Sequence, residues 1–332
     1  MKKLSEAKLS ILDLASIAHG KTIADSFHNS VQLAQHAERL GFERFWLAEH
    51  HNLEGIASAA TAVLIGHIAG HTSKIRVGSG GIMLPNHAPL TIAEQFGTLA
   101  TLYPGRIDLG LGRAPGTDAP TMRALRRDMT GREAEFSDLV KELQYYFLPA
   151  QEGQKVRAIP GAGTDVPLWL LGSSLYSAQL AAELGLPFAF AGHFAPEMMM
   201  QAIDIYRVGF RPSKVLDKPY VMVGVQVLAA DTQEKANLLA TTVYQRFLGI
   251  IRNQRVSLQP PVQNMDAYWG PAERDLVLSR LRTSVIGDPA QVRLGMQKLV
   301  NATGADELII VSDAFDPQDR LRSYEIIMEV SK

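Results

Sequence analysis

The sequence predicts an α/β fold: a single (β/α)8 TIM barrel with loop insertions over residues 1–332. Short apolar runs alternate with longer amphipathic segments along the whole chain, and eight such units follow one another without a change in composition. Strands that alternate with helices in this way form parallel βαβ units. An open doubly wound sheet would also fit the alternation, but eight uninterrupted units favour the closed barrel.

Four strand–helix units account for the first half of the chain. Their strands are short apolar runs, and their helices carry apolar residues three and four positions apart. Gly41 ends the first helix, and Pro89 stands in the first turn of the third. The expected strands are 9–14, 45–48, one that begins at 75–78, and 107–111, and the expected helices are 25–40, 58–69, 89–101 and 133–147.

The second half repeats the pattern with four more strands. Asp231 is the expected N-cap of the helix that follows the longest strand. The expected strands are 167–171, 187–191, 220–229 and 307–311, and the expected helices are 174–184, 196–208, 231–247, 289–303 and 318–330. Residues 151–166 and 252–280 are rich in Gln, Pro and Gly and lack clear periodicity, so we expect loop insertions there, the second a candidate lid.

Composition narrows the class of function. The 33 basic and 34 acidic side chains give a net charge of -1, which excludes general, non-specific electrostatic binding of nucleic acid. The absence of cysteine excludes disulfides, thiol nucleophiles and cysteine-ligated metals. Glu6, Lys8 and Asp13 interrupt a signal-like start, and no apolar stretch reaches the roughly 18 residues of a membrane span. We therefore expect a cytoplasmic protein with a small-molecule partner and neither nucleic acid nor membrane as a partner.

Polar and glycine residues concentrate directly after the predicted strands. In a (β/α)8 barrel these positions meet at one end, where active sites are built. Their coincidence in successive units is stronger evidence than any single motif. The candidates are Asp13, Glu49, His50, Gly80, Gly81, Arg113, Ser173, Ser174, Ser177 and His193.

Glu49, His50 and His51 raise the question of a metal. Adjacent side chains of a strand point to opposite faces, and the HExxH pattern of zinc proteases is absent. We therefore predict no metal site. A loop histidine with a functional role and a histidine that serves the structure both remain open at this point.

Two segments have the composition of a phosphate site. Arg113 lies in a glycine-rich loop, where its guanidinium suits a phosphate or a salt bridge to a neighbouring loop. Ser173 and Ser174 precede a helix whose free N–H groups bind anions, although such serines are also ordinary N-caps. Taken together, the two segments favour a phosphate site. Three glycines within residues 78–81 permit a flat ring against the backbone, or a tight turn.

Three blocks of sequence resemble the bacterial luciferase-like flavin monooxygenases, and within them a branch of uncharacterised small-chain bacterial proteins. The blocks are WLAEHHN at 46–52, the long segment 78–116, and GSSLYSAQLAAELGLPFAF at 172–190. The resemblance runs over nearly the whole chain and is weakest in 252–280. It implies a (β/α)8 barrel that binds FMN, or in some branches the deazaflavin F420, at the C-terminal ends of the strands.

The resemblance also implies roles for single residues. Gly80 and Gly81 match a pair joined by a non-prolyl cis peptide beside the isoalloxazine ring. His50 matches a histidine implicated in luciferase turnover, with Glu49 beside it. The positions implied to bind the flavin phosphate are Arg113, Ser173, where luciferase has a glutamate, Ser174 and Ser177. Asp13 and His193 are secondary candidates.

The implied reaction is that of a flavin-dependent monooxygenase. Reduced FMN, supplied by a separate flavin reductase, would react with O2 to give a flavin peroxide that oxidises a small organic substrate. One alternative is an FMN- or F420-dependent oxidoreductase that transfers hydride, and another is a non-catalytic flavin-binding protein. Relatives are commonly dimers, so we expect a homodimer. No motif in the sequence identifies the substrate.

Overall fold

The computed structural model describes residues 2–114, 118–125, 135–254 and 257–332. Nine parallel strands and the helices between them make up this part of the chain. The strands are β1 Lys8–Asp13, β2 Arg44–Leu47, β3 Arg76–Met83, β4 Ile107–Gly112, β5 Leu168–Gly172, β6 Phe188–Phe190, β7 Val221–Ala229, β8 Val285–Gly287 and β9 Glu307–Val311. The α-helices are α1 Ile23–Leu40, α2 Thr61–Gly70, α3 Pro89–Leu102, α4 Ala119–Leu125, α5 Phe136–Phe147, α6 Leu175–Leu184, α7 Met199–Gly209, α8 Gln233–Ile251, α9 Pro271–Arg280, α10 Pro289–Thr303 and α11 Pro317–Ser331.

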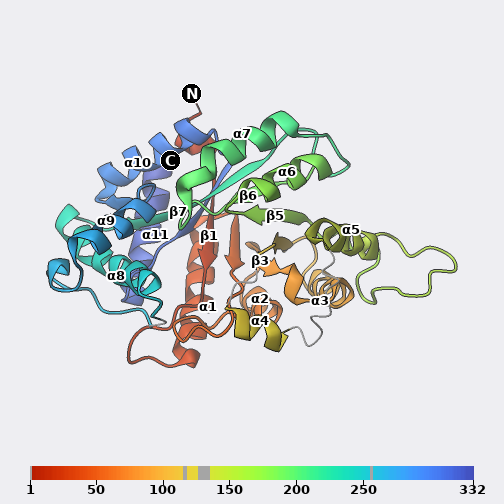
Figure 1. Cartoon of the computed structure of the whole chain (residues 1–332), viewed down its shortest axis with the longest axis horizontal. Helices are drawn as coiled ribbons and strands as arrows, with labels where there is room; N and C mark the ends of the chain where they lie inside the picture. Colours follow the sequence, from red (N-terminus) through yellow and green to blue (C-terminus); the bar gives the residue numbers. More distant parts are fainter. Residues whose placement is uncertain (1, 115–117, 126–134, 255–256) are drawn as a thin grey trace.

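Eight of these strands close into a barrel. Strands β1 to β7 follow one another around it in chain order, and β9 fills the place between β7 and β1. The helices surround the strands (Figure 1). The predicted (β/α)8 barrel is therefore confirmed.

Most predicted elements agree with the structure within a few residues, and the exceptions share a cause. The helix α4 and the strand β8 were not expected, and α9 lies inside the segment 252–280 that we expected to be a loop insertion. Among their residues, α4 buries none and α9 only Val277, while β8 is a strand of three residues. Such elements carry no apolar periodicity that a sequence could reveal.

The expected N-cap of α8 is also wrong by one residue. Thr232, not Asp231, caps the helix, because its hydroxyl accepts a hydrogen bond from the Lys235 backbone N–H at 3.2 Å. The Asp231 carboxylate instead accepts two hydrogen bonds from Arg322 of α11. Residues 151–166 contain turns and neither helix nor strand.

A buried ionic network fills the N-terminal end of the barrel. Arg44, the first residue of β2, donates to Glu307 of β9 and to Asp108 of β4, in each case with a shortest distance of 2.7 Å. Arg76 of β3 adds a second cation on Asp108, and the Tyr220 hydroxyl donates to Glu307 at 2.8 Å. These residues stand at the beginnings of their strands, so the opposite end of the barrel is left for a ligand site.

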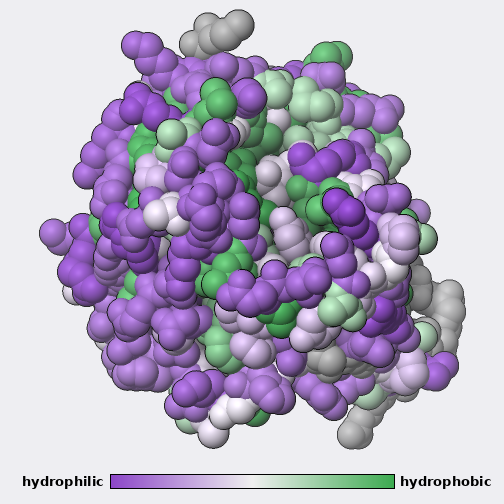
Figure 2. All heavy atoms as spheres, turned by 90° about the vertical axis from the view of Figure 1, so that its left-hand side faces the viewer, coloured by the Kyte–Doolittle hydropathy of each residue, from purple (hydrophilic) through white to green (hydrophobic). Residues whose placement is uncertain are grey.

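Among the helices that the structure describes, none combines the length and the apolar character that a membrane crossing requires. The face shown in Figure 2 is mostly hydrophilic, and its hydrophobic residues gather in a hollow near the middle.

Candidate active site

A cavity of about 780 Å³ lies at the C-terminal ends of the barrel strands. This volume falls within the range of roughly 300–1,000 Å³ that is usual for pockets that bind small molecules and cofactors. Eight of the ten candidate residues line it: His50, Gly80, Gly81, Arg113, Ser173, Ser174, Ser177 and His193. Glu49 and Asp13 are not among the lining residues.

Arg113 and three serines form one wall of the cavity, where β4 and β5 end. Ser174 is the N-cap of α6 by position, but its side chain makes no capping hydrogen bond. Arg113 forms no ion pair with an acidic side chain among the described residues, and its guanidinium lies 4.4 Å from the ring centre of Tyr176. The two alternatives to a phosphate site, a capping serine and a loop salt bridge, therefore find no support in the geometry.

Close packing surrounds the Gly80–Gly81 pair of β3. A Cβ atom on Gly81 would lie 2.7 Å from the carbonyl oxygen of Gly110 in β4, so the backbone leaves no room for a side chain at this position. A Cβ atom on Gly80 would lie 2.6 Å from a methyl group at the movable end of the Leu12 side chain. The peptide bond between Gly80 and Gly81 is cis, as the resemblance implied. The pair thus gives the cavity a floor of bare backbone.

His50 and His193 line the cavity as neutral imidazoles. The Nδ1 atom of each is buried without a hydrogen-bond partner among the described residues. Burial, reinforced by the positive charge of Arg246, lowers the pKa of His50 to about 4 and that of His193 to about 3. At pH 7 each ring is therefore uncharged, and can accept a proton or a hydrogen bond from a ligand.

Acid is expected to destabilise the fold through these two histidines. The pKa values of His50 and His193 are lower in the folded state, so stability is present above about pH 6.5 and is lost as the pH falls toward 4. His193→Gln should flatten the pH dependence of the unfolding free energy by up to about 1.4 kcal/mol per pH unit in this window. Urea unfolding at several pH values measures this, with His28→Gln, at an exposed position, as the control. Equal slopes in wild type and His193→Gln would contradict the assignment.

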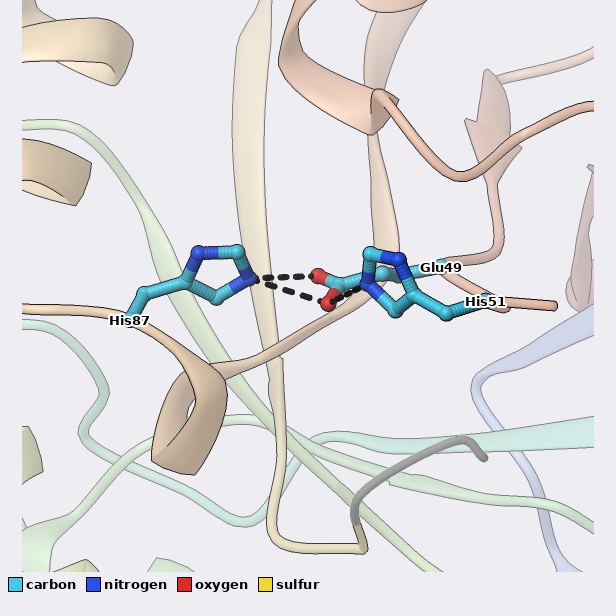
Figure 3. Close-up of side chains that lie close together, drawn as sticks. All are labelled: Glu49, His51 and His87. Carbon is cyan, nitrogen blue, oxygen red and sulfur yellow. Dashed lines mark hydrogen bonds and ion pairs between the residues drawn. The ribbon is translucent and has the colours of Figure 1, made fainter. Parts of the chain in front are cut away.

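Glu49 lies between two imidazoles (Figure 3). Its Oε1 atom is 2.8 Å from His51 Nε2 and 2.9 Å from His87 Nε2, and its Oε2 accepts the Met83 backbone N–H at 3.0 Å. Burial alone would raise the pKa of Glu49, but these hydrogen bonds, led by that of His87, outweigh it and hold the pKa below its ordinary value. The carboxylate is therefore the acceptor from both rings, and it ties the segment after β2 to the segment after β3.

The same three side chains have the composition of a metal site, since their ligand atoms lie within 4.8 Å of one another. A tetrahedral zinc ion with bonds of about 2.1 Å would hold its ligand atoms roughly 3.4 Å apart. The observed separations of 2.8 and 2.9 Å are those of hydrogen bonds. Glu49 thus orders the backbone on both sides of His50 as a hydrogen-bond acceptor.

Asp13 has a structural environment at the end of β1. Its carboxylate accepts hydrogen bonds from Arg320 of α11 at 2.9 Å and from the Ser30 hydroxyl of α1 at 2.5 Å. The side chain is fully buried, so its charge is matched by that of Arg320. Asp13 therefore joins the barrel to its outer helices.

The sequence analysis missed several polar residues of the cavity, and Asp313, Gln226 and Arg246 are among them. Asp313 follows β9 by two residues, and the strand-end criterion would have found it if it had been applied to the last strand. Gln226 is the one amide within the otherwise apolar run of β7, and that interruption was a usable signal. Arg246 lies on α8 and forms an ion pair with Asp313 at 2.7 Å. It was missed because the search covered only residues that directly follow a strand.

The segment 252–280 also borders the cavity. Asn253, Gln254, Leu258 and Arg280 contribute to the lining. This segment holds α9 and the short 3-10 helix Met265–Ala267. The described residues of this segment therefore border one side of the site.

Comparison with known proteins shows which family shares this sequence and architecture. The family model for luciferase-like monooxygenases matches residues 8–307. The chain is 53% identical over 323 residues to a luciferase-like monooxygenase of Escherichia coli K12, covering 97% of this chain and 96% of that one. It is 42% identical to the N-acetyl-S-alkylcysteine monooxygenase of Bacillus subtilis, over 55% of this chain and 56% of the relative.

A solved structure agrees with these relatives. The crystal structure of apo-MsnO8 superposes with a TM-score of 0.87 at 36% identity, covering 99% of this chain and 98% of that one. The match extends over the barrel and the strand ends that line the cavity. The chain therefore belongs to the luciferase-like monooxygenase family and is an oxidoreductase enzyme.

Proposed function

We propose that this enzyme is a flavin-dependent monooxygenase that uses reduced FMN and O2 to oxidise a small organic substrate. The observation that carries the proposal is the phosphate-binding wall of Arg113 and the serines at the N-terminus of α6. An arginine beside free helical N–H groups suits a doubly charged phosphate. The glycine floor of β3 lies in the same cavity and leaves room for a flat ring against the backbone.

The residues of the chain bind, orient and shield, while the flavin supplies the redox chemistry. When bound, reduced flavin would give two electrons to O2, of which one oxygen atom goes to the substrate and the other leaves as water. Arg113, Ser173, Ser174 and Ser177 would hold the phosphate. Neutral His50, which lines the cavity, would accept a proton from a bound molecule.

Glu49 would act on His50 from behind the cavity wall. It does not line the cavity, and both of its oxygens are engaged by His51, His87 and the backbone. We therefore assign it a positioning role and not contact with the reacting atoms. The apolar lining around His50, which includes Leu14 and Ile56, would exclude water from the reacting groups.

Titration with flavins tests the proposal. FMN, FAD, riboflavin and F420 are added side by side in oxidised and reduced form, and binding is followed by protein fluorescence or calorimetry. FMN is expected to bind more tightly than riboflavin, because only FMN carries the phosphate that the Arg113 wall would hold. Absence of binding by all four flavins in both redox states would refute the proposal.

The second candidate is an FMN- or F420-dependent oxidoreductase that transfers hydride. It is favoured by the same cavity, since a phosphate wall and a ring floor also suit hydride transfer. A single turnover with and without O2 separates the two: a monooxygenase forms oxidised substrate only when O2 is present. The non-catalytic alternative is not retained, because the chain belongs to an enzyme family.

Two macromolecular partners belong to the same proposal. A separate flavin reductase would supply the reduced cofactor. A second copy of the chain would form the expected homodimer and cover apolar residues such as Val63 on α2 and Leu102 on α3, which are exposed on neighbouring helices.

A further inference from the structure

A second polar wall of the cavity faces the phosphate-binding wall. In the ring of eight barrel strands, β9 stands four positions from β4, so the two strands lie on opposite sides. Arg113 follows β4, while Asp313 follows β9 and binds Arg246 of α8. Cationic groups therefore lie on opposite sides of the cavity, and a flavin phosphate held at Arg113 leaves the Arg246 wall to another ligand.

Most of the hydrogen-bonding capacity of Arg246 is unused. The guanidinium donates from Nη1 to Asp313 Oδ2 at 2.7 Å, and its Nε and Nη2 atoms make no hydrogen bond to any described residue. The side chain is only 20% exposed. An arginine has five N–H donors in a planar fork that matches a carboxylate. The unused donors can therefore take a second oxygen pair from a ligand.

Gln226 provides an independent sign that a ligand binds at this wall. Its side chain is 2% exposed and lines the cavity, yet its Nε2 atom has no hydrogen-bond partner in the part of the chain that the structure describes. A buried N–H group without a partner costs about 1–3 kcal/mol. Rotation of the amide about its last side-chain bond would turn this N–H group toward the cavity, where it can donate to an oxygen of a bound molecule.

Apolar side chains and a further positive charge share the cavity with Arg246. Phe247 and Ile250 follow Arg246 on α8 and line the same cavity, and Ile250, four residues on, shares its helix face. Leu14 and Val311 line the cavity from the ends of β1 and β9. Arg280, at the end of α9, also lines the cavity. A ligand with an apolar body and an anionic end complements these groups.

We propose that the wall of Arg246 and Gln226 binds the carboxylate of the substrate, so that the enzyme acts on organic acids with an apolar body. The inference rests on the proposed flavin-dependent function and narrows its substrate class. Arg246 would bind the carboxylate through Nε and Nη2, and Gln226 would donate from Nε2. The apolar body would then extend toward the glycine floor and His50.

The test compares an acid with its neutral amide on the FMN-loaded enzyme. N-acetyl-S-benzyl-cysteine and its carboxamide serve as probes, and binding is measured by calorimetry and by the absorbance change of the bound FMN. The acid is expected to bind about tenfold or more tightly than the amide. In Arg246→Met this preference should disappear, while Arg246→Lys should retain part of it.

Two further variants separate recognition from structure. Asp313→Asn keeps an oxygen beside Arg246 but removes its negative charge, so the preference for the acid should increase. Arg293→Met, at an exposed position on α10, should leave both affinities unchanged. If the wild type binds FMN but binds the acid and the amide equally, or does not bind the acid, the inference is overturned. Loss of FMN binding by the wild type would instead refute the proposed function.

Discussion

Arg44→Met is expected to lower the free energy of unfolding by about 3–5 kcal/mol, the cost of leaving one member of a buried ion pair without its partner. Arg44 is 5% exposed and holds the fully buried Glu307 with two N–H groups. Without the guanidinium, Glu307 retains only hydroxyl donors, from Tyr220 and Ser10. Urea unfolding followed by circular dichroism measures the loss.

The reason for this loss can be tested with a second substitution. Glu307→Gln in the Arg44→Met background removes the uncompensated charge, so it should restore part of the stability. Arg293→Met, which removes an exposed arginine, should change the midpoint little. A loss below about 1 kcal/mol in Arg44→Met would show that the network contributes as little as a surface ion pair.

Arg113→Met is expected to weaken FMN binding about 10- to 100-fold, because a hydrogen bond to a charged group contributes about 1.5–3 kcal/mol. Arg113 lies at the end of β4 beside the N-terminus of α6, and no acidic side chain among the described residues competes for it. Fluorescence titration of wild type and variant with FMN gives the two dissociation constants.

Riboflavin is the matched control for this substitution. It has the same ring system as FMN but no phosphate, so its affinity should be nearly equal in wild type and Arg113→Met. A parallel loss of FMN and riboflavin affinity would show that Arg113 contacts the flavin ring system or stabilises the fold, and does not bind the phosphate. An unchanged FMN affinity would remove Arg113 from the phosphate site.

Sequence periodicity predicted the elements that bury an apolar face. The helix expected at 289–303 and the strand expected at 307–311 have these bounds in the structure, as α10 and β9. Helix α9 was missed because it buries only Val277, so its formation depends on packing against α8 and not on its own pattern. Local patterns report burial, and an element with little burial leaves no pattern.

The strand-end rule found eight lining residues because parallel strands bring their C-terminal ends to one rim. It could not decide which neighbour faces the cavity. Glu49 and His50 are adjacent, and only His50 lines the site, since successive side chains of an extended chain alternate in direction. It also missed Arg246, which comes to the rim from α8.

The sequence by itself determined the alternation of strands and helices and the polar ends of the strands. These features depend on residues near one another in the chain. Only the tertiary structure decided which charges meet: Arg44 with Glu307, 263 residues apart, and Arg246 with Asp313, 67 residues apart. The sequence tells which kind of group a charged side chain can bind. Closure of the barrel decides which partner that side chain meets, and which of its N–H donors remain available to a ligand.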